Sequence, residues 1–289
     1  MAKRQFSSTA STPKFATYKK QFAEHLIMER RNGIIQLRMH TKGGPLKWCP
    51  QVHHMLLEAW PVIGSDPENE VMILTSTDPY WIGEFDHESF KAWDTATDPD
   101  LRYNGLYRPT KSVENLIWGL DIPTIAVING PGAVHFNFAI LCDITLCSPD
   151  FVIRDDHFRM GMVPGDSQSL ILQGLIGTKR GAYSMYMGEN IDAKTALEWG
   201  IINEVLPKKK LLPRAWEIAE HIMKQPRAVR HLTHQLAVRP WKRLFTDDYQ
   251  IHITSEMYSI ALMKSKHDFN VIKAGIKAEK KGTVTRAKR

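Results

Sequence analysis

The segment RDDHFRMGMVPGDSQS, residues 154–169, places a histidine and a carboxylate in one loop. His157 and Asp166 are the residue types of a general-base pair, because a neutral imidazole held by a carboxylate can take a proton from water. Two other interpretations stay open. Asp166 stands just before an expected helix, where an N-cap aspartate is common, and His157 could be an ordinary loop histidine. Spacing alone makes this pair a candidate for water activation.

A second histidine, His135, follows the turn Gly130-Pro131-Gly132. We expect it in the first turn of the apolar helix AVHFNFAILC, where the helix dipole lowers the pKa of an imidazole and favours its neutral form. A neutral imidazole can donate a hydrogen bond to a developing oxyanion. The alternative is a core histidine whose hydrogen bonds are satisfied internally.

The elements that position these loops alternate between apolar runs and turns. The runs VMILTST and TIAVIN are typical of buried parallel strands, and glycine-containing loops follow both. Ligands of open α/β sheets gather beyond the carboxyl ends of such strands. The alternation predicts an α/β fold with crossover helices. We expect strands over 24–30, 33–39, 71–77, 124–129, 144–148 and 151–153, the first two joined by the Asn32-Gly33 hairpin turn.

Helical patterns cover about 51–63, 110–119 and most of the chain after residue 167. Asp192 is an expected N-cap, and Gly200 is the expected C′ residue of the same helix. A helical stretch from 211 to about 265 completes the body of the chain. Its histidines, His221, His231 and His234, are interpreted as solvated.

The composition is that of a soluble globular domain. The chain has 289 residues, of which 43% are hydrophobic and 24% are charged. Three cysteines predict no disulfide framework and fit a reducing compartment. We expect a cytoplasmic protein with no membrane partner, because no segment resembles a secretory signal or a membrane span. The net charge of +7 is concentrated near the C-terminus without a nucleic-acid-binding motif, so no nucleic-acid partner is expected.

Several segments together resemble the crotonase (enoyl-CoA hydratase/isomerase) superfamily over roughly residues 24–265. They are IGEFD, PTIAVINGPG, CDITLCSPDFVIRDDHFRMGMVPGD and GENIDAKTALEWGIINEVLP. The resemblance implies a crotonase-type ββα spiral fold with a helical C-terminal trimerisation region, in a homotrimer or hexamer. We expect a flexible N-terminal arm (1–20), a crotonase-fold core (21–210), a helical C-terminal region of the same domain (211–268) and a basic flexible tail (269–289).

Three departures from the superfamily pattern bear on chemistry. The two catalytic glutamates of the hydratases fall at Phe138 and His157 here. A glycine whose N–H forms half of their oxyanion hole is replaced by His135. A small Ala-Asp pair in the coenzyme A cradle is replaced by Glu84-Phe85. Hydration of an acyl-CoA by a pair of glutamates is therefore not expected.

The replacements resemble one subgroup, the β-diketone hydrolases related to 6-oxocamphor hydrolase. The resemblance implies catalytic roles for residues in LKWCPQVH, NGPGAVH, DDHF, VPGD and HITSEMY. These catalytic residues are Trp48, His135, His157, Asp166 and Glu256, and the implied substrate-binding residues are His53, Ile82 and Phe85.

The implied reaction is a retro-Claisen hydrolysis of a cyclic or bicyclic β-diketone to a keto acid. His157, oriented by Asp166, would deprotonate water, and His135 and Trp48 would donate to the carbonyl oxygen. No metal or organic cofactor is expected, since these donors suffice to stabilise an enolate. Two alternatives stay open: an acyl-CoA hydratase, isomerase or thioesterase, and a catalytically inactive crotonase-fold scaffold.

Overall fold

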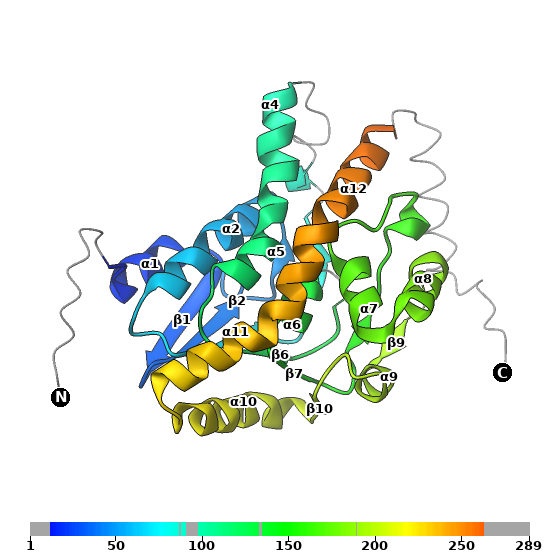
Figure 1. Ribbon diagram of the computed structural model, residues 1–289. Helices are drawn as coiled ribbons and strands as arrows, with labels where there is room; N and C mark the ends of the chain where they lie inside the picture. Colours follow the sequence, from blue (N-terminus) through cyan, green and yellow to red (C-terminus); the bar gives the residue numbers. More distant parts are fainter. Residues whose placement is uncertain (1–11, 87, 91–97, 133–134, 189, 263–289) are drawn as a thin grey trace.

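The computed structural model describes residues 12–86, 88–90, 98–132, 135–188 and 190–262. At its centre is a six-stranded sheet in the order β1-β2-β4-β6-β7-β10 (Figure 1). β1 and β2 are antiparallel, and every other neighbouring pair is parallel, which confirms the predicted α/β class. The strands of this sheet are β1 (Leu26–Arg31), β2 (Ile34–Met39), β4 (Val71–Ser76), β6 (Thr124–Ile128), β7 (Ile144–Cys147) and β10 (Glu204–Val205).

The central strands are apolar at successive positions because both faces of the sheet are covered. In β4, Met72 and Leu74 join the larger core, whereas Val71 and Ile73 join a second core on the opposite face. Helix α10 (Lys208–Met223) closes the second core, and α2 (Pro50–Ser65) and α5 (Arg108–Trp118) belong to the larger one. The larger core also supports the loops that follow the carboxyl ends of the strands.

The predicted hairpin forms at its expected turn. Asn32 and Gly33 have φ values of 52° and 82°, the left-handed conformation that a two-residue hairpin turn of this kind requires. The predicted helix caps also form. Asp192 accepts a hydrogen bond from the backbone N–H of Thr195 at 2.7 Å, and Gly200 has a φ of 73° after helix α9 (Ala193–Glu198) ends.

The other helices connect and flank the sheet. Two short ladders, β3 (Lys47–Trp48) with β5 (Glu84–Phe85) and β8 (Val152–Ile153) with β9 (Ile191–Asp192), lie outside it. The remaining helical segments are α1 (Phe15–Gln21), α4 (Pro99–Arg102), η1 (Tyr103–Tyr107), α6 (Asn137–Ile140), η2 (Phe158–Met160), α7 (Gln168–Ile176), α8 (Thr178–Met187), α9 (Ala193–Glu198), α11 (Arg227–Leu244), η3 (Phe245–Tyr249) and α12 (Gln250–Leu262).

Four details differ from the sequence-based expectations. Helix α1 overlaps the end of the segment predicted as a flexible arm, where Tyr18 is buried and donates a hydrogen bond to Asp66. The 151–153 strand pairs with β9 outside the main sheet. The helix expected after Gly132 is only α6, so His135 precedes it. His234 is buried rather than solvated, because it is hydrogen bonded to Asp143 at 2.8 Å. The predicted tail, 269–289, lies outside the described residues.

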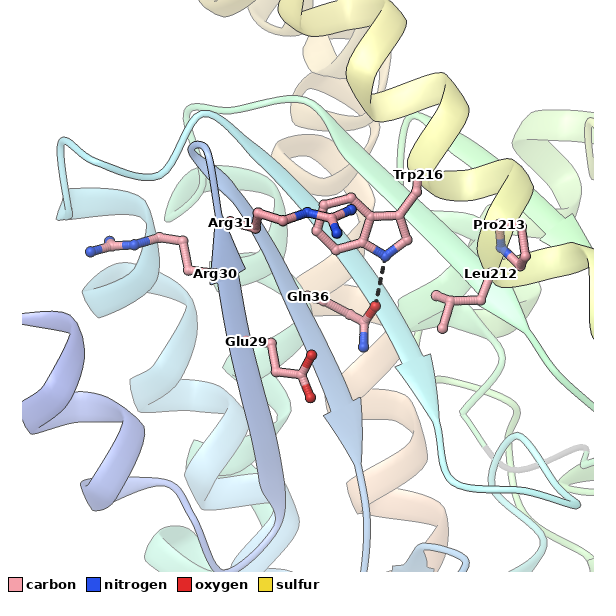
Figure 2. A pocket seen from close by; sticks show the side chains of 7 residues that line it. All are labelled: Glu29, Arg30, Arg31, Gln36, Leu212, Pro213 and Trp216. Carbon is pink, nitrogen blue, oxygen red and sulfur yellow. Dashed lines mark hydrogen bonds between the residues drawn. The ribbon is translucent and has the colours of Figure 1, made fainter.

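The outer side of the β1–β2 hairpin carries a shallow groove beside α10 (Figure 2). The Trp216 indole N–H donates to Gln36 Oε1 at 2.9 Å, and the Arg31 guanidinium lies 4.3 Å from the indole ring. These contacts attach α10 to the hairpin. None of the residues that line the groove is a candidate catalytic residue.

Among the described residues, no helix combines the length and the apolarity that crossing a bilayer would require.

Candidate active site

The loops that follow β2, β4 and β6 meet beyond the carboxyl ends of these strands, as expected for a parallel sheet. Gly132, with a φ of 145°, lies against Ile82 so closely that an added Cβ would be 2.6 Å from the Ile82 carbonyl oxygen. The Trp81 backbone N–H donates to the Pro131 carbonyl, and its indole N–H donates to the His135 carbonyl. These contacts fix His135 beside the loop that carries Ile82.

His135 lies in a cluster of aromatic rings. Its ring centroid is 3.9 Å from that of Trp48 and 5.1 Å from that of His53. Its φ of 47° is a left-handed conformation that non-glycine residues rarely adopt. The buried Nδ1 of His135 has no hydrogen-bond partner among the described residues. This nitrogen lies 3.7 Å from Asp166 Oδ2.

His157 is held by the carboxylate two residues before it. Its Nδ1 lies 2.7 Å from Asp155 Oδ1, and the same oxygen accepts the His157 backbone N–H at 3.0 Å. The distance from Nε2 to Asp166 Oδ2 is 3.9 Å, which exceeds a hydrogen bond. The expectation from sequence was that Asp166 orients His157; in this structure Asp155, and not Asp166, lies within hydrogen-bonding distance of the ring.

Asp166 and Glu256 both lie on the Nε2 side of His157. Glu256 Oε1 is 3.8 Å from Nε2. Asp166 accepts hydrogen bonds from the Gln168 side-chain amide at both oxygens, at 3.0 and 2.8 Å. The arrangement leaves Nε2 between two carboxyl groups without a direct hydrogen bond to either.

Helix α12 brings Glu256 into the site through a close approach to the loop after η2. An added Cβ on Gly165 would lie 2.1 Å from the His252 carbonyl oxygen and 2.7 Å from Glu256 Cβ, so only glycine fits at this contact. The Val163 backbone N–H also donates to Ser259 Oγ at 3.1 Å. The position of the Glu256 carboxyl therefore depends on the packing of two segments that are distant in the sequence.

Burial and mutual charge set the protonation of these groups. Burial, followed by the charges of His53 and His157, holds the pKa of His135 well below its usual range. Burial likewise lowers the pKa of His53. Both imidazoles are therefore neutral near pH 7. A neutral imidazole keeps one N–H donor and one acceptor nitrogen.

His157 behaves in the opposite way. Burial alone would lower its pKa, but the negative charges of Asp166 and Asp155 outweigh burial and raise it well above the usual range. Burial raises the pKa of Asp166 and that of Glu256, the latter to about 8. The cluster can therefore both hold and release protons near neutral pH.

The structure brings most of the sequence-predicted residues into one continuous group. Trp48 and His53 contact His135, which lies beside Asp166; His157 and Glu256 complete the series. Ile82 supports Gly132 through its backbone. Phe85 differs, because it is 38% exposed and its ring stacks on Phe90 at 4.4 Å.

Sequence reasoning missed two polar contributors, Asp155 and Gln168. The spacing Asp-x-His carried a signal for the first, since an aspartate commonly accepts the backbone N–H two residues later. Asp155, His157 and Asp166 each place a ligand atom within 4.8 Å of the others, so these residues could hold a metal ion.

The match to known proteins covers most of the chain. Residues 29–281 match the family model described as enoyl-CoA hydratase/isomerase. This chain belongs to the enoyl-CoA hydratase/isomerase family. A curated relative in this family is hydroxycinnamoyl-CoA hydratase-lyase from Pseudomonas fluorescens, 24% identical over 211 residues, which are 72% of this chain and 76% of that protein.

Solved structures of the family have the same fold. A β-diketone hydrolase from the cyanobacterium Anabaena, bound to (S)-3-oxocyclohexyl acetic acid, is 31% identical with a TM-score of 0.80. The alignment covers 86% of this chain and 98% of that one. An enoyl-CoA hydratase/isomerase from Mycobacterium paratuberculosis has a TM-score of 0.75 at 18% identity, over 87% of this chain and 98% of that one.

Proposed function

We propose that this protein hydrolyses a carbon–carbon bond of a cyclic or bicyclic β-diketone and releases a keto acid. The observation that carries the proposal is the contiguous series Trp48, His135, Asp166, His157 and Glu256, in which His157 stands where the superfamily resemblance implies a glutamate in the hydratases. The likeness to a solved β-diketone hydrolase supports it.

The reaction begins with water. Neutral His157 takes one proton at Nε2 while the water oxygen forms a bond to one carbonyl carbon. The N–H of neutral His135 and the indole of Trp48 stabilise the resulting oxyanion, because donors fixed in a buried site need little reorganisation. Both donors are compatible with a compact, uncharged substrate.

The tetrahedral intermediate then collapses. The bond between the attacked carbon and the central carbon of the diketone breaks, and its electron pair moves onto the departing carbon as an enolate. A proton from His157 or Glu256 reaches that carbon, so the sum is one diketone plus one water giving one keto acid. Glu256, with a pKa of about 8, retains a proton to donate near neutral pH.

A second candidate function is acyl-CoA chemistry, which the names of curated relatives favour. The replacement of a glutamate position by Phe138, which is fully buried, opposes it because phenylalanine cannot transfer a proton. A catalytically inactive scaffold is the remaining alternative.

The test is to incubate the purified protein with a panel of bicyclic 1,3-diketones and, separately, with crotonyl-CoA, and to follow products by mass spectrometry. We expect keto acids that gain the mass of one water and incorporate ¹⁸O from labelled water. The His157→Ala variant is the control for contaminating activity. Turnover of crotonyl-CoA alone would favour the second candidate, and turnover of neither class would favour the inactive scaffold.

A further inference from the structure

We propose that Asp155 is the positioning residue for His157, holding its Nδ1–H so that Nε2 faces the reacting water, and that Asp166 does not perform this role. The geometry that carries the proposal is the 2.7 Å contact between Nδ1 and Asp155 Oδ1. The inference names a residue of the proposed β-diketone hydrolase site and rests on that proposed function for its kinetic predictions.

The position of Asp155 is fixed locally. Its Oδ1 accepts the His157 backbone N–H at 3.0 Å in addition to the contact with the imidazole. This local side-chain to backbone hydrogen bond sets the direction of the carboxylate, and it does not depend on contacts from distant segments. An acceptor at Nδ1 places the proton there and leaves the Nε2 lone pair as the base.

Asp166 is hydrogen bonded to other groups than His157. Both its oxygens accept hydrogen bonds from the Gln168 amide, and its Oδ2 is 3.7 Å from His135 Nδ1. Its distance of 3.9 Å from His157 Nε2 places it on the side of the ring where the water reacts. An oxygen atom about 2.8 Å from Nε2 can also lie within hydrogen-bond reach of Asp166 or Glu256.

The buried charge of Asp155 also favours proton transfer to His157. Asp155 is 7% exposed, and its second oxygen, Oδ2, is buried without a hydrogen-bond partner among the described residues. A buried carboxylate with an unsatisfied oxygen is stabilised when the adjacent imidazole becomes positive. Asp155 therefore gains most when His157 has taken the proton from water, which is a contribution to the transition state.

The experiment compares Asp155→Asn with a matched control at the next residue, Asp156→Asn. Asp156 forms ion pairs with Arg154 and Arg159 outside the catalytic group, so its variant tests loss of a carboxylate in the same loop. We expect Asp155→Asn to lower kcat for the diketone about 10²–10⁴-fold, the usual contribution of general-base catalysis, with a much smaller change in KM. Asp156→Asn should keep kcat within about twofold, because its partly exposed ion pairs lie away from the proposed reacting atoms.

Two further measurements separate positioning from a purely structural role. In the His157→Ala background, Asp155→Asn should lower kcat only slightly further, because residues that act as a unit give non-additive losses of kcat. Full multiplication of the two losses would overturn the proposal. Proton–nitrogen NMR of labelled imidazoles should show the hydrogen-bonded Nδ1–H of His157 in wild type and in Asp166→Asn, and its loss or upfield shift in Asp155→Asn.

The NMR result does not need a substrate, so it distinguishes failure of this inference from failure of the proposed function. An unchanged Nδ1–H resonance in Asp155→Asn, with its loss in Asp166→Asn, would overturn the inference even if diketones are hydrolysed. Loss of activity on dialysis against EDTA, restored by a divalent cation, would also overturn it by making Asp155 a metal ligand.

Discussion

At the scale of residues, the site combines two kinds of histidine. His135 is neutral because it is buried beside other imidazoles, whereas His157 has a raised pKa because carboxylates surround it. The difference assigns them opposite chemistry: His135 can donate a hydrogen bond without carrying charge, and His157 can accept and return a proton. The sequence indicated that both histidines lie in loops that could carry chemistry. The low pKa of His135 was expected from a helix dipole, but its main cause in the structure is burial.

Replacing His135 tests the oxyanion role. We expect His135→Ala to lower kcat for the diketone about 100- to 1000-fold, since one oxyanion donor typically contributes about 2.7–4 kcal/mol. KM should change less, because the oxyanion carries more charge than the ground-state carbonyl. His135→Gly serves as the matched variant, since glycine tolerates the φ of 47° without strain. The measurement is steady-state kinetics. If both variants keep the wild-type kcat, His135 has only a packing role.

The raised pKa of His157 predicts how activity depends on pH. The base must be neutral, and its carboxylate neighbours favour the protonated form, so kcat/KM should rise with pH through a value above the ordinary 6.5 of histidine. Below that value we expect about a tenfold loss per pH unit. The measurement is kcat/KM across the pH range in which circular dichroism shows the fold intact. A profile that is flat from pH 6 upward would contradict the protonated resting state.

At the scale of elements, the site depends on how α12 meets the loop between η2 and α7. Glycine at position 165 allows the helix to approach within contact of that loop, which brings Glu256 beside His157. Helix α11 is itself attached to the sheet region, since Arg230 and Arg227 pair with Glu70 and His234 is bonded to Asp143. The C-terminal helices are therefore part of the architecture of the candidate site.

Gly165→Ala tests this contact. The added methyl would meet the His252 carbonyl, so we expect a loss of about 1–3 kcal/mol of stability from overpacking. The melting temperature should fall by roughly 2–4 °C for each kcal/mol, and kcat should fall as Glu256 is displaced. Gly44→Ala is the control, since its nearest atom would be 3.7 Å away. Calorimetry and kinetics that cannot distinguish the two variants would contradict the role assigned to this close approach.

At the scale of the whole molecule, apolar side chains remain exposed on the C-terminal helices. Leu232 and Leu236 of α11 are 66% and 72% exposed, and Tyr258 of α12 is 67% exposed. Leu232 and Leu236 are four residues apart and so lie on one face of α11, which makes that face a candidate association surface. The superfamily resemblance implies trimers, so these helices are the expected contact region.

Sedimentation should therefore give a multiple of three subunits of 33.1 kDa. Leu232→Glu combined with Leu236→Glu should lower the association state, because two buried charges would have to lose their hydration. Leu101→Glu, at an exposed leucine of α4, should leave the mass unchanged. A wild-type protein that sediments as a stable single subunit at micromolar concentration would refute the predicted assembly.

The sequence by itself determined the features that arise from neighbouring residues. The continuous apolar runs predicted buried parallel strands, Asn32-Gly33 predicted the hairpin, and Asp192 and Gly200 predicted the limits of a helix. Each depends on local conformational preference or on burial of both faces of a strand. The order of the motifs also predicted the family, to which the chain belongs.

Only the tertiary structure decided which residues of the candidate site contact one another. Two aspartates precede His157 and a third follows nine positions later, and nothing local indicates which of them reaches Nδ1. That choice depends on the path of the loop, which ends with Asp155 bonded to the ring and Asp166 bonded to Gln168. Glu256 lies beside His157, and His234 is buried, because helices distant in the sequence pack on the sheet and its loops. Long-range packing sets these contacts, and side-chain spacing along the chain does not encode it.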